Sequence, residues 1–215
     1  KFKEIYKKSI EDPENFWKEA SDDIFWFKKP SKILNKSNPP FYKWFEDGVT
    51  NTCYNAIDIQ IDKGQGNKTA LIYDSPITGS KSTLTYEELR SKVSKFAGAL
   101  TNQGVNKGDR VIIYMPMIPE AVIAMLACGR IGAIHSVVFG GFASNELASR
   151  IDDSKAKILV TASCGFEPGR TVEYKPLVDE AVKLASHKIS KMILFQRKGH
   201  EAKLNAPNEI SWDEA

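Results

Sequence analysis

Two short segments contain residue types that can bind a phosphorylated ligand. The first, residues 138–144, places the neighbours Gly140 and Gly141 after a predicted strand and before a predicted helix. Because glycine has no side chain, a ligand can approach the main chain closely there. The second, residues 162–170, runs from a buried strand through a Pro–Gly turn to Arg170, whose guanidinium group suits phosphate. On their residues alone, both segments fit ordinary turns as well as ligand-binding loops.

Other residues are weaker candidates for chemistry. His135 lies in a predicted strand and has the chemistry of a general base, but no motif places an Asp, Cys or nucleophilic Ser beside it. We therefore predict a hydrogen-bonded core histidine. Cys164 is expected in a loop, as a weak candidate for a reactive thiol, whereas Cys128 is expected to be buried and inert. Asp152 and its neighbour Asp153 are interpreted as surface charge rather than as metal ligands.

The two glycine-containing segments are predicted to follow strands of a parallel sheet. Strands are expected at residues 110–115, 133–139, 157–163 and 190–196, and helices at residues 119–128, 144–151 and 174–185. Strands that alternate with helices at this spacing pair in parallel through right-handed crossovers. The fold class is therefore α/β, a parallel sheet flanked by helices. Such sheets bind ligands where the strands end and the helix N-termini begin.

A hairpin and a capped helix are predicted before this sheet. The hairpin joins residues 68–74 to residues 82–85 through a turn. Thr85 and Glu88 have the spacing of a capping box, which begins a helix. The apolar residues of this helix fall on one face and are Leu89, Val93, Phe96, Ala97 and Leu100.

Residues 1–60 are predicted to form an aromatic-rich extension that wraps over the body of the protein, residues 61–215. Half of the aromatic residues lie within the first 45 positions, and prolines interrupt regular structure at positions 30, 39 and 40. Because a segment this interrupted is not expected to enclose a core by itself, its aromatic side chains need another surface. The alternative is a small independent domain. Within the segment, Asp12 followed by Pro13 predicts the start of a short helix.

The composition argues against several classes of function. The 215 residues include 30 Lys and Arg against 27 Asp and Glu, with both signs interspersed, so nucleic acid is not an expected partner. No stretch approaches the ~20 apolar residues of a membrane span, and no membrane partner is expected. The three cysteines are widely spaced, which fits neither a disulfide framework nor a zinc site. A reducing compartment is expected, either the cytoplasm or the mitochondrial matrix.

The central part of the chain resembles the AMP-forming short-chain acyl-CoA synthetases, the acetyl- and propionyl-CoA synthetase branch of the adenylate-forming enzymes. The motifs that carry this resemblance are G-D-R-V at 108–111, Y-M-P-M-I-P-E at 114–120, A-C-G-R-I-G-A-I-H-S at 127–136 and V-F-G-G-F at 138–142. Trp44 with Phe45, and N-A-I-D at 55–58, are similar to the aromatic N-terminal extension of this branch. The resemblance covers essentially the whole chain.

Within the branch, the E-P-G-R turn is similar to the propionyl-CoA synthetase type, which includes mitochondrial short-chain enzymes. The resemblance implies that Glu167, Pro168, Gly169 and Arg170 bind the nucleotide end of coenzyme A, with Arg170 on its phosphates. It also implies that Gly141 lies beside the pantetheine arm. Glu167 departs from the acetyl enzymes, which place a cation at this position. Only Arg170 is therefore an electrostatically sensible phosphate ligand, and the other residues are expected to act through backbone and shape.

The resemblance implies a two-step reaction. A carboxylate, propionate or acetate, attacks the α-phosphate of ATP bound with Mg²⁺ to give an acyl-adenylate and pyrophosphate, and the thiol of coenzyme A then displaces AMP. The family's phosphate loop, T-S-G-T-T-G-x-P-K, does not occur in these 215 residues. We therefore assign no catalytic residue and no metal ligand to the chain, and predict that it is inactive in isolation.

The expected partners are small molecules and the remainder of the same polypeptide. On this interpretation the chain is the N-terminal part of a longer ligase. The alternative is a truncated or non-catalytic product that keeps this region as a nucleotide- or coenzyme A-binding module. An acetate rather than a propionate ligase differs from the first interpretation only in substrate.

Overall fold

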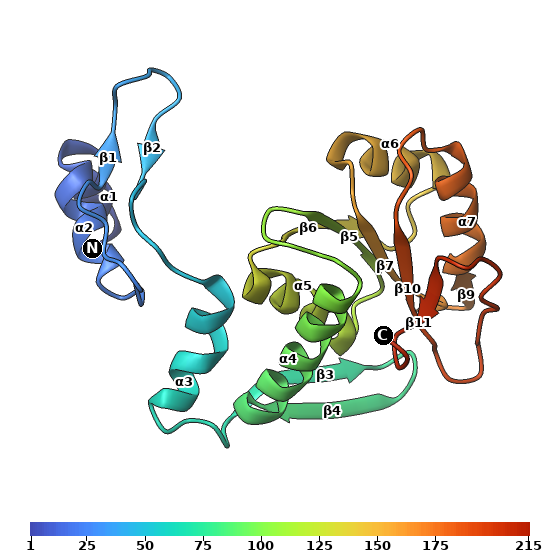
Figure 1. Cartoon of the computed structure of the whole chain (residues 1–215). Coiled ribbons are helices and arrows are strands. Elements are labelled where there is room, and N and C mark those ends of the chain that lie inside the picture. Colours follow the sequence, from blue (N-terminus) through green and yellow to red (C-terminus); the bar gives the residue numbers. More distant parts are fainter. The chain divides into compact units, whose positions relative to one another are not determined.

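The computed structural model describes residues 1–215, which divide into two compact units, residues 1–59 and residues 60–215. The predicted wrapping of the first unit over the second stays a prediction. No helix combines the length and the apolar character that a membrane span requires. The second unit contains the parallel sheet and is the larger of the two (Figure 1).

The first unit begins with two short helices, α1 (Phe2–Glu11) and α2 (Pro13–Ser21). As predicted, the Asp12 side chain caps α2, since its carboxylate accepts the N–H of Asn15, and Pro13 occupies the first helical position. A two-stranded antiparallel ladder, β1 (Leu34–Asn35) and β2 (Lys43–Trp44), follows. A π-helical turn, η1 (Tyr54–Asp58), then leads to α3 (Ile59–Asp62).

The aromatic side chains of the first unit pack largely on one another. Phe25 lies 4.8 Å from the ring of Tyr54, and Trp26 lies 5.5 Å from Phe45, measured between ring centroids. Asn55 holds this cluster together, because its side chain accepts the N–H of Phe25 at 2.8 Å and donates to the carbonyl of the same residue at 3.1 Å. The N-A-I-D motif thus has a structural role within this unit.

The second unit is built on five parallel strands in the order β11-β10-β7-β5-β6. The strands are β5 (Arg110–Met115), β6 (Ile134–Phe139), β7 (Ile158–Ala162), β10 (Lys191–Phe195) and β11 (Glu209–Ser211). The predicted parallel sheet is confirmed, and β11 is an additional edge strand that the sequence pattern did not predict. Strands β5 and β7 are central and buried on both faces, which explains their continuous apolar runs.

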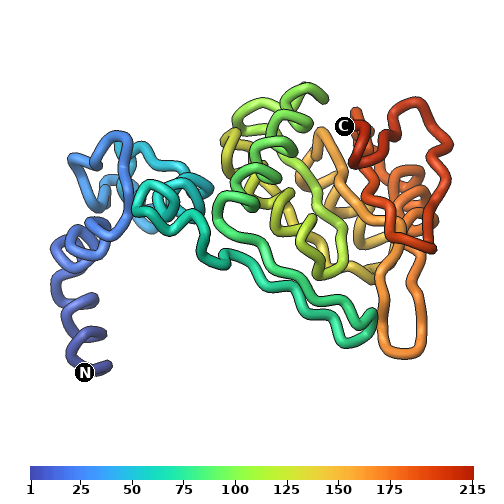
Figure 2. The backbone as a smooth tube through the Cα atoms, turned by 90° about the horizontal axis from the view of Figure 1, so that it is seen from below, coloured from blue at the N-terminus to red at the C-terminus, as the bar shows by residue number.

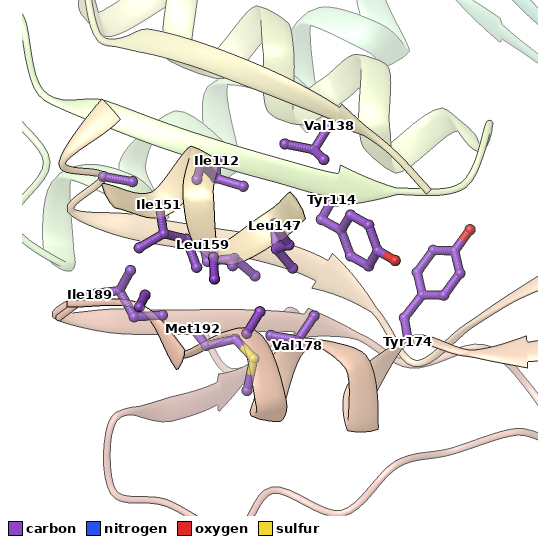
Figure 3. Packing of buried hydrophobic residues seen from close by; sticks show 14 residues of the cluster. Ile112, Tyr114, Val138, Leu147, Ile151, Leu159, Tyr174, Val178, Ile189 and Met192 are labelled. Carbon is purple, nitrogen blue, oxygen red and sulfur yellow. The ribbon is translucent and has the colours of Figure 1, made fainter. Parts of the chain in front are cut away.

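Helices cover both faces of this sheet (Figure 1). They are α4 (Tyr86–Asn102), α5 (Pro119–Ile131), α6 (Ser144–Ser154) and α7 (Tyr174–Leu184). Helices α4 and α5 lie on one face and α6 and α7 on the other. The core on the second side contains Ile112 and Leu159 of the sheet, Leu147 and Ile151 of α6, and Val178 of α7 (Figure 3). The capping box at the start of α4 is confirmed, and the apolar face predicted for this helix is buried.

Two antiparallel hairpins stand beyond the sheet. The predicted one is formed by β3 (Thr69–Ser75) and β4 (Ser80–Thr85). The other is formed by β8 (Cys164–Glu167) and β9 (Arg170–Glu173), a segment predicted only as a loop. Figure 2 shows both as long loops projecting from the same side of the second unit.

The structure corrects two predictions about single residues. His135 is exposed on the edge strand β6 and is not a core histidine, because β6 has a neighbour on one side only. Cys164 lies in strand β8 and is completely buried, because the segment pairs with β9 instead of forming an open loop. Burial raises the pKa of the Cys164 thiol, which keeps it protonated and unreactive. Cys128 is buried as predicted, and its pKa is raised to about 12.

Candidate functional site

The Gly140–Gly141 corner connects the end of β6 to the start of α6 and is hydrogen-bonded to the side chain of Tyr114. The hydroxyl oxygen of Tyr114 accepts the N–H of Gly141 at 3.2 Å, and its proton is donated to the carbonyl of Phe142 at 2.9 Å. Gly141 has a φ of +116°, a conformation that L-residues with side chains rarely adopt. The corner is therefore a defined backbone structure rather than a loose turn.

A second tyrosine packs against the same corner. Tyr174 is the first residue of α7, and its ring lies 4.9 Å from the ring of Tyr114, measured between centroids (Figure 3). A Cβ atom on Gly165 would lie only 2.5 Å from the Tyr174 hydroxyl, and a Cβ atom on Gly140 would collide with it. Both positions thus require glycine because the tyrosine approaches the backbone closely.

The E-P-G-R residues form the tip of the β8–β9 hairpin. Pro168 and Gly169 make the turn, where Gly169 has a φ of +77°, as the third position of a type II turn requires. The Arg170 guanidinium returns to Glu167, with Nε and Nη2 at 2.7 and 2.6 Å from the same carboxylate oxygen. The side chains of Arg170 and Glu167 are 70% and 36% exposed, so the pair is open to a ligand.

The structure brings the corner and the hairpin together. A Cβ atom on Gly141 would lie 3.7 Å from Oε1 of Glu167, in ordinary van der Waals contact. Gly141, Glu167 and Arg170 therefore belong to one surface, although they come from different loops of the chain. Gly169 has no neighbour within 4 Å of where its Cβ would stand, so the tip of the hairpin is open.

A groove of about 370 Å³ runs beside this surface at the carboxyl-terminal edge of the sheet. One wall comes from the corner and the hairpin, and the other from the β3–β4 turn and the segment between β5 and α5. Its lining includes Phe139, Gly140, Gly165, Glu167, Tyr174 and Arg197. The guanidinium carbon of Arg197 lies 4.7 Å from the centre of the Phe166 ring, which adds a second cation to the groove.

These groups are suited to binding. Backbone at a glycine corner, two guanidinium groups and a phenol hydroxyl can hold phosphate and amide groups of an extended ligand. Burial is the largest cause that raises the pKa of Tyr174 to about 12, followed by the neighbouring Tyr114 and Glu167. Its hydroxyl is protonated at neutral pH, as in any tyrosine, and can act as a hydrogen-bond donor.

The sequence pattern indicated Gly141 and the E-P-G-R residues but not the two tyrosines. Tyr114 belongs to an apolar strand, and Tyr174 is the first residue of a predicted helix, so neither carries a local mark of function. Gly140 and Gly165 both lie beside the Tyr174 hydroxyl, but only the folded structure brings these two glycines together.

Comparison with known proteins is consistent with this geometry. Residues 59–214 match the family described as AMP-binding enzyme, and residues 2–56 match the family described as acetyl-coenzyme A synthetase N-terminus. The chain is 52% identical over 214 residues to the human mitochondrial acyl-CoA synthetase short-chain family member 3. It is 44% identical over 211 residues to the acetyl-coenzyme A synthetase of Streptomyces avermitilis.

The alignments cover nearly all of this chain but only part of each relative. They include 99% of the chain and 31% of the human protein, and 98% of the chain and 32% of the bacterial one. The solved acetoacetyl-CoA synthetase of Streptomyces lividans superimposes with a TM-score of 0.85 at 24% identity, over 96% of this chain and 31% of that structure. At that identity, the superposition shows a shared fold.

Proposed function

The chain belongs to the AMP-binding enzyme family, and on that premise we propose that it forms the N-terminal third of an AMP-forming short-chain acyl-CoA synthetase. The full-length enzyme then contains this chain together with the two thirds of its relatives' length that the alignments leave uncovered. In the proposed reaction, a short-chain carboxylate is activated by ATP to an acyl-adenylate, and coenzyme A takes up the acyl group. This chain supplies one wall of the coenzyme A site.

The observation that supports this proposal is the juxtaposition of Gly141 with Glu167 and Arg170. A glycine corner that admits an extended chain closely, next to an exposed guanidinium, fits a ligand with a slender arm at one end and phosphates at the other. Coenzyme A has this composition. The nucleotide end is proposed to lie at Arg170 and the pantetheine arm along Gly141.

The ion pair between Arg170 and Glu167 does not prevent phosphate binding. A solvent-exposed pair of this kind contributes about 0–1 kcal/mol. A hydrogen bond from a guanidinium to a charged phosphate contributes about 1.5–3 kcal/mol. A phosphate can therefore displace the carboxylate or share the guanidinium with it. Pro168 and Gly169 are proposed to act by shaping the turn.

ATP and Mg²⁺ are proposed substrates and cofactor of the full-length enzyme, without a ligand among these residues. Mg²⁺ would neutralise the phosphates of ATP during adenylation. The residues of this chain bind and orient coenzyme A, while the acyl pocket and the adenylation groups are proposed to lie in the remaining two thirds.

The proposed acyl substrate is propionate, and acetate is the competing one. The E-P-G-R turn supports propionate, because it is similar to the propionyl-CoA synthetase type. Steady-state kinetics of the full-length enzyme with acetate, propionate and butyrate distinguish the two. The proposed compartment is the cytoplasm or the mitochondrial matrix, and the name of the human relative supports the latter.

The site is tested by Arg170→Ala in the full-length enzyme. The KM for coenzyme A is expected to rise about tenfold or more, because one charge-assisted contact to phosphate is lost. Carboxylate-dependent ATP–pyrophosphate exchange is expected to stay nearly unchanged, since adenylation precedes coenzyme A binding. Lys183→Ala, which removes the same charge from an exposed site on α7, is the control. If Arg170→Ala lowers exchange and thioester formation equally, Arg170 does not act by binding the phosphates of coenzyme A.

The activity of the isolated chain is tested separately. We expect no propionate-dependent ATP–pyrophosphate exchange from the 215 residues alone, because the phosphate loop of the family is not among them. Turnover above a blank without enzyme would overturn this expectation. It would also show that residues within this chain carry out adenylation.

A further inference from the structure

The hydroxyl group of Tyr174 has no hydrogen-bond partner within the protein. The residue is only 3% exposed, yet it lines the groove. Its hydroxyl oxygen is not fully enclosed by other protein atoms. The small exposed part of the residue therefore includes the hydroxyl oxygen, which reaches the groove between Gly140 and Gly165.

The neighbouring tyrosine shows a different arrangement. The hydroxyl of Tyr114 makes two hydrogen bonds to the corner backbone, one from Gly141 and one to Phe142. Figure 3 shows both phenol oxygens at the same end of the sheet, on adjacent rings. Tyr114 has a complete structural role, whereas the hydroxyl of Tyr174 has none.

A phenylalanine would fit this structure better than Tyr174 does. The hydroxyl forms no hydrogen bond within the protein, and its close approach to the backbone requires glycine at two positions. A hydroxyl group that reaches a groove and has no partner in the protein is free to form its hydrogen bond with a bound ligand. The hydroxyl is thus explained if a ligand in the groove accepts its proton in a hydrogen bond.

We propose that Tyr174 is a binding residue for the pantetheine arm, and that its hydroxyl donates a hydrogen bond to an amide carbonyl of that arm. This inference rests on the proposed function, which places the arm along Gly141, next to Gly140. The arm contains two secondary amides, whose carbonyl oxygens are good acceptors. A tyrosine phenol, whose ordinary pKa is about 10, carries its proton at neutral pH and can donate it in a hydrogen bond.

The test uses the full-length enzyme and three ligands whose dissociation constants are measured by isothermal titration calorimetry. Coenzyme A contains both ends of the carrier, adenosine bisphosphate contains only the nucleotide end, and pantetheine contains only the arm. For Tyr174→Phe, dissociation constants for coenzyme A and pantetheine are expected to rise about 3- to 10-fold, while the constant for adenosine bisphosphate stays unchanged. Arg170→Ala is expected to show the opposite selectivity between the two half-ligands.

Tyr86→Phe is the matched control, because Tyr86 is also the first residue of a helix, α4, and lies outside the groove. It is expected to leave all three constants unchanged. If the full-length Tyr174→Phe enzyme binds coenzyme A and pantetheine as the unmodified enzyme does, the inference fails while the proposed function stands. Equal weakening of all three ligands indicates a structural role and also overturns it. If none of the three ligands binds the unmodified full-length enzyme, the proposed function itself fails.

Discussion

Glu167 and Arg170 face each other across the Pro168–Gly169 turn, with Nε of the arginine 2.7 Å from Oε2 of the glutamate. A carboxylate thus stands beside the cation to which we assign the phosphates of coenzyme A. The two opposite charges make the local field at the hairpin tip weaker than that of a lone guanidinium.

Glu167→Gln is expected to strengthen phosphate binding, because it removes the competing negative charge and keeps the size of the side chain. The affinity for adenosine bisphosphate should rise about 2- to 5-fold at low salt and less at high salt, where exposed charges are screened. Isothermal titration calorimetry at two ionic strengths measures this. Glu173→Gln, which removes the same charge at the base of the hairpin, is the control. Equal gains in both variants would point to net charge rather than to the Glu167–Arg170 pair.

Gly140→Ala is expected to destabilise the second unit by about 1–3 kcal/mol, because the added methyl group collides with the Tyr174 hydroxyl and approaches the carbonyl of Met115. Urea unfolding measures the loss. Adding Tyr174→Phe should recover part of it, since the colliding oxygen is then absent. Gly98→Ala in α4 is the control: no atom lies within 4 Å of its Cβ position, and stability should rise slightly. If Gly140→Ala leaves the free energy of unfolding unchanged, the Tyr174 hydroxyl does not approach Gly140 this closely.

Lys175→Met is expected to be strongly destabilising, by about 3 kcal/mol. The Lys175 side chain is 5% exposed, and its ammonium nitrogen lies 2.6 Å from Asp179 and 3.1 Å from Glu209, so its removal leaves two carboxylates close together without their cation. Thermal unfolding is the measurement. Lys183→Met, on the exposed face of the same helix, should change stability little. Similar effects in both variants would show that the buried cation does not hold β11 to α7.

Stability at acid pH is expected to depend on Asp109. Hydrogen bonds from Lys157 and from the backbone of Asn106 lower the pKa of this carboxyl group. A carboxyl group with a lowered folded-state pKa contributes stability above its unfolded pKa of about 3.9, and this contribution disappears as the pH falls through the folded value.

Asp109→Asn should therefore be less stable than the unmodified chain near neutral pH, by about 1 kcal/mol or less, and should lose less stability below about pH 4. Melting temperatures between about pH 3 and pH 7 test this. If the melting temperatures of both proteins fall by the same amount as the pH is lowered, Asp109 does not cause this loss of stability. The G-D-R-V motif, of which Asp109 is part, thus has a structural role in this unit.

Several features of the fold were predictable because their causes are local. The capping box needs only Thr85 and Glu88, three residues apart, and the apolar face of α4 follows from helical spacing. Strand β5 was predictable from its unbroken apolar run, which is typical of a strand covered on both faces. Gly141 and Arg170 stay predicted binding residues, and the prediction rests on short motifs that resemble those of known enzymes.

Other features depend on residues that are far apart in the chain. His135 was predicted in the core, but β6 is an edge strand, and only the strand order shows this. The segment around Cys164 was predicted as a loop, but its pairing with β9 buries the thiol. The Tyr174 hydroxyl meets Gly140, 34 positions earlier in the chain, through the packing of α7 against the sheet.

Taken residue by residue, the chain specifies its helices, most of its strands and the chemical groups that a ligand can use, because these follow from backbone preferences and periodicity over a few neighbours. Which groups share one surface is a property of packing. Gly141 and Glu167 become neighbours only when β6 and β8 end at the same edge of the unit. Tyr174 gains its place between two glycines only when α7 lies on the sheet, since contact between distant residues depends on how whole elements fit together.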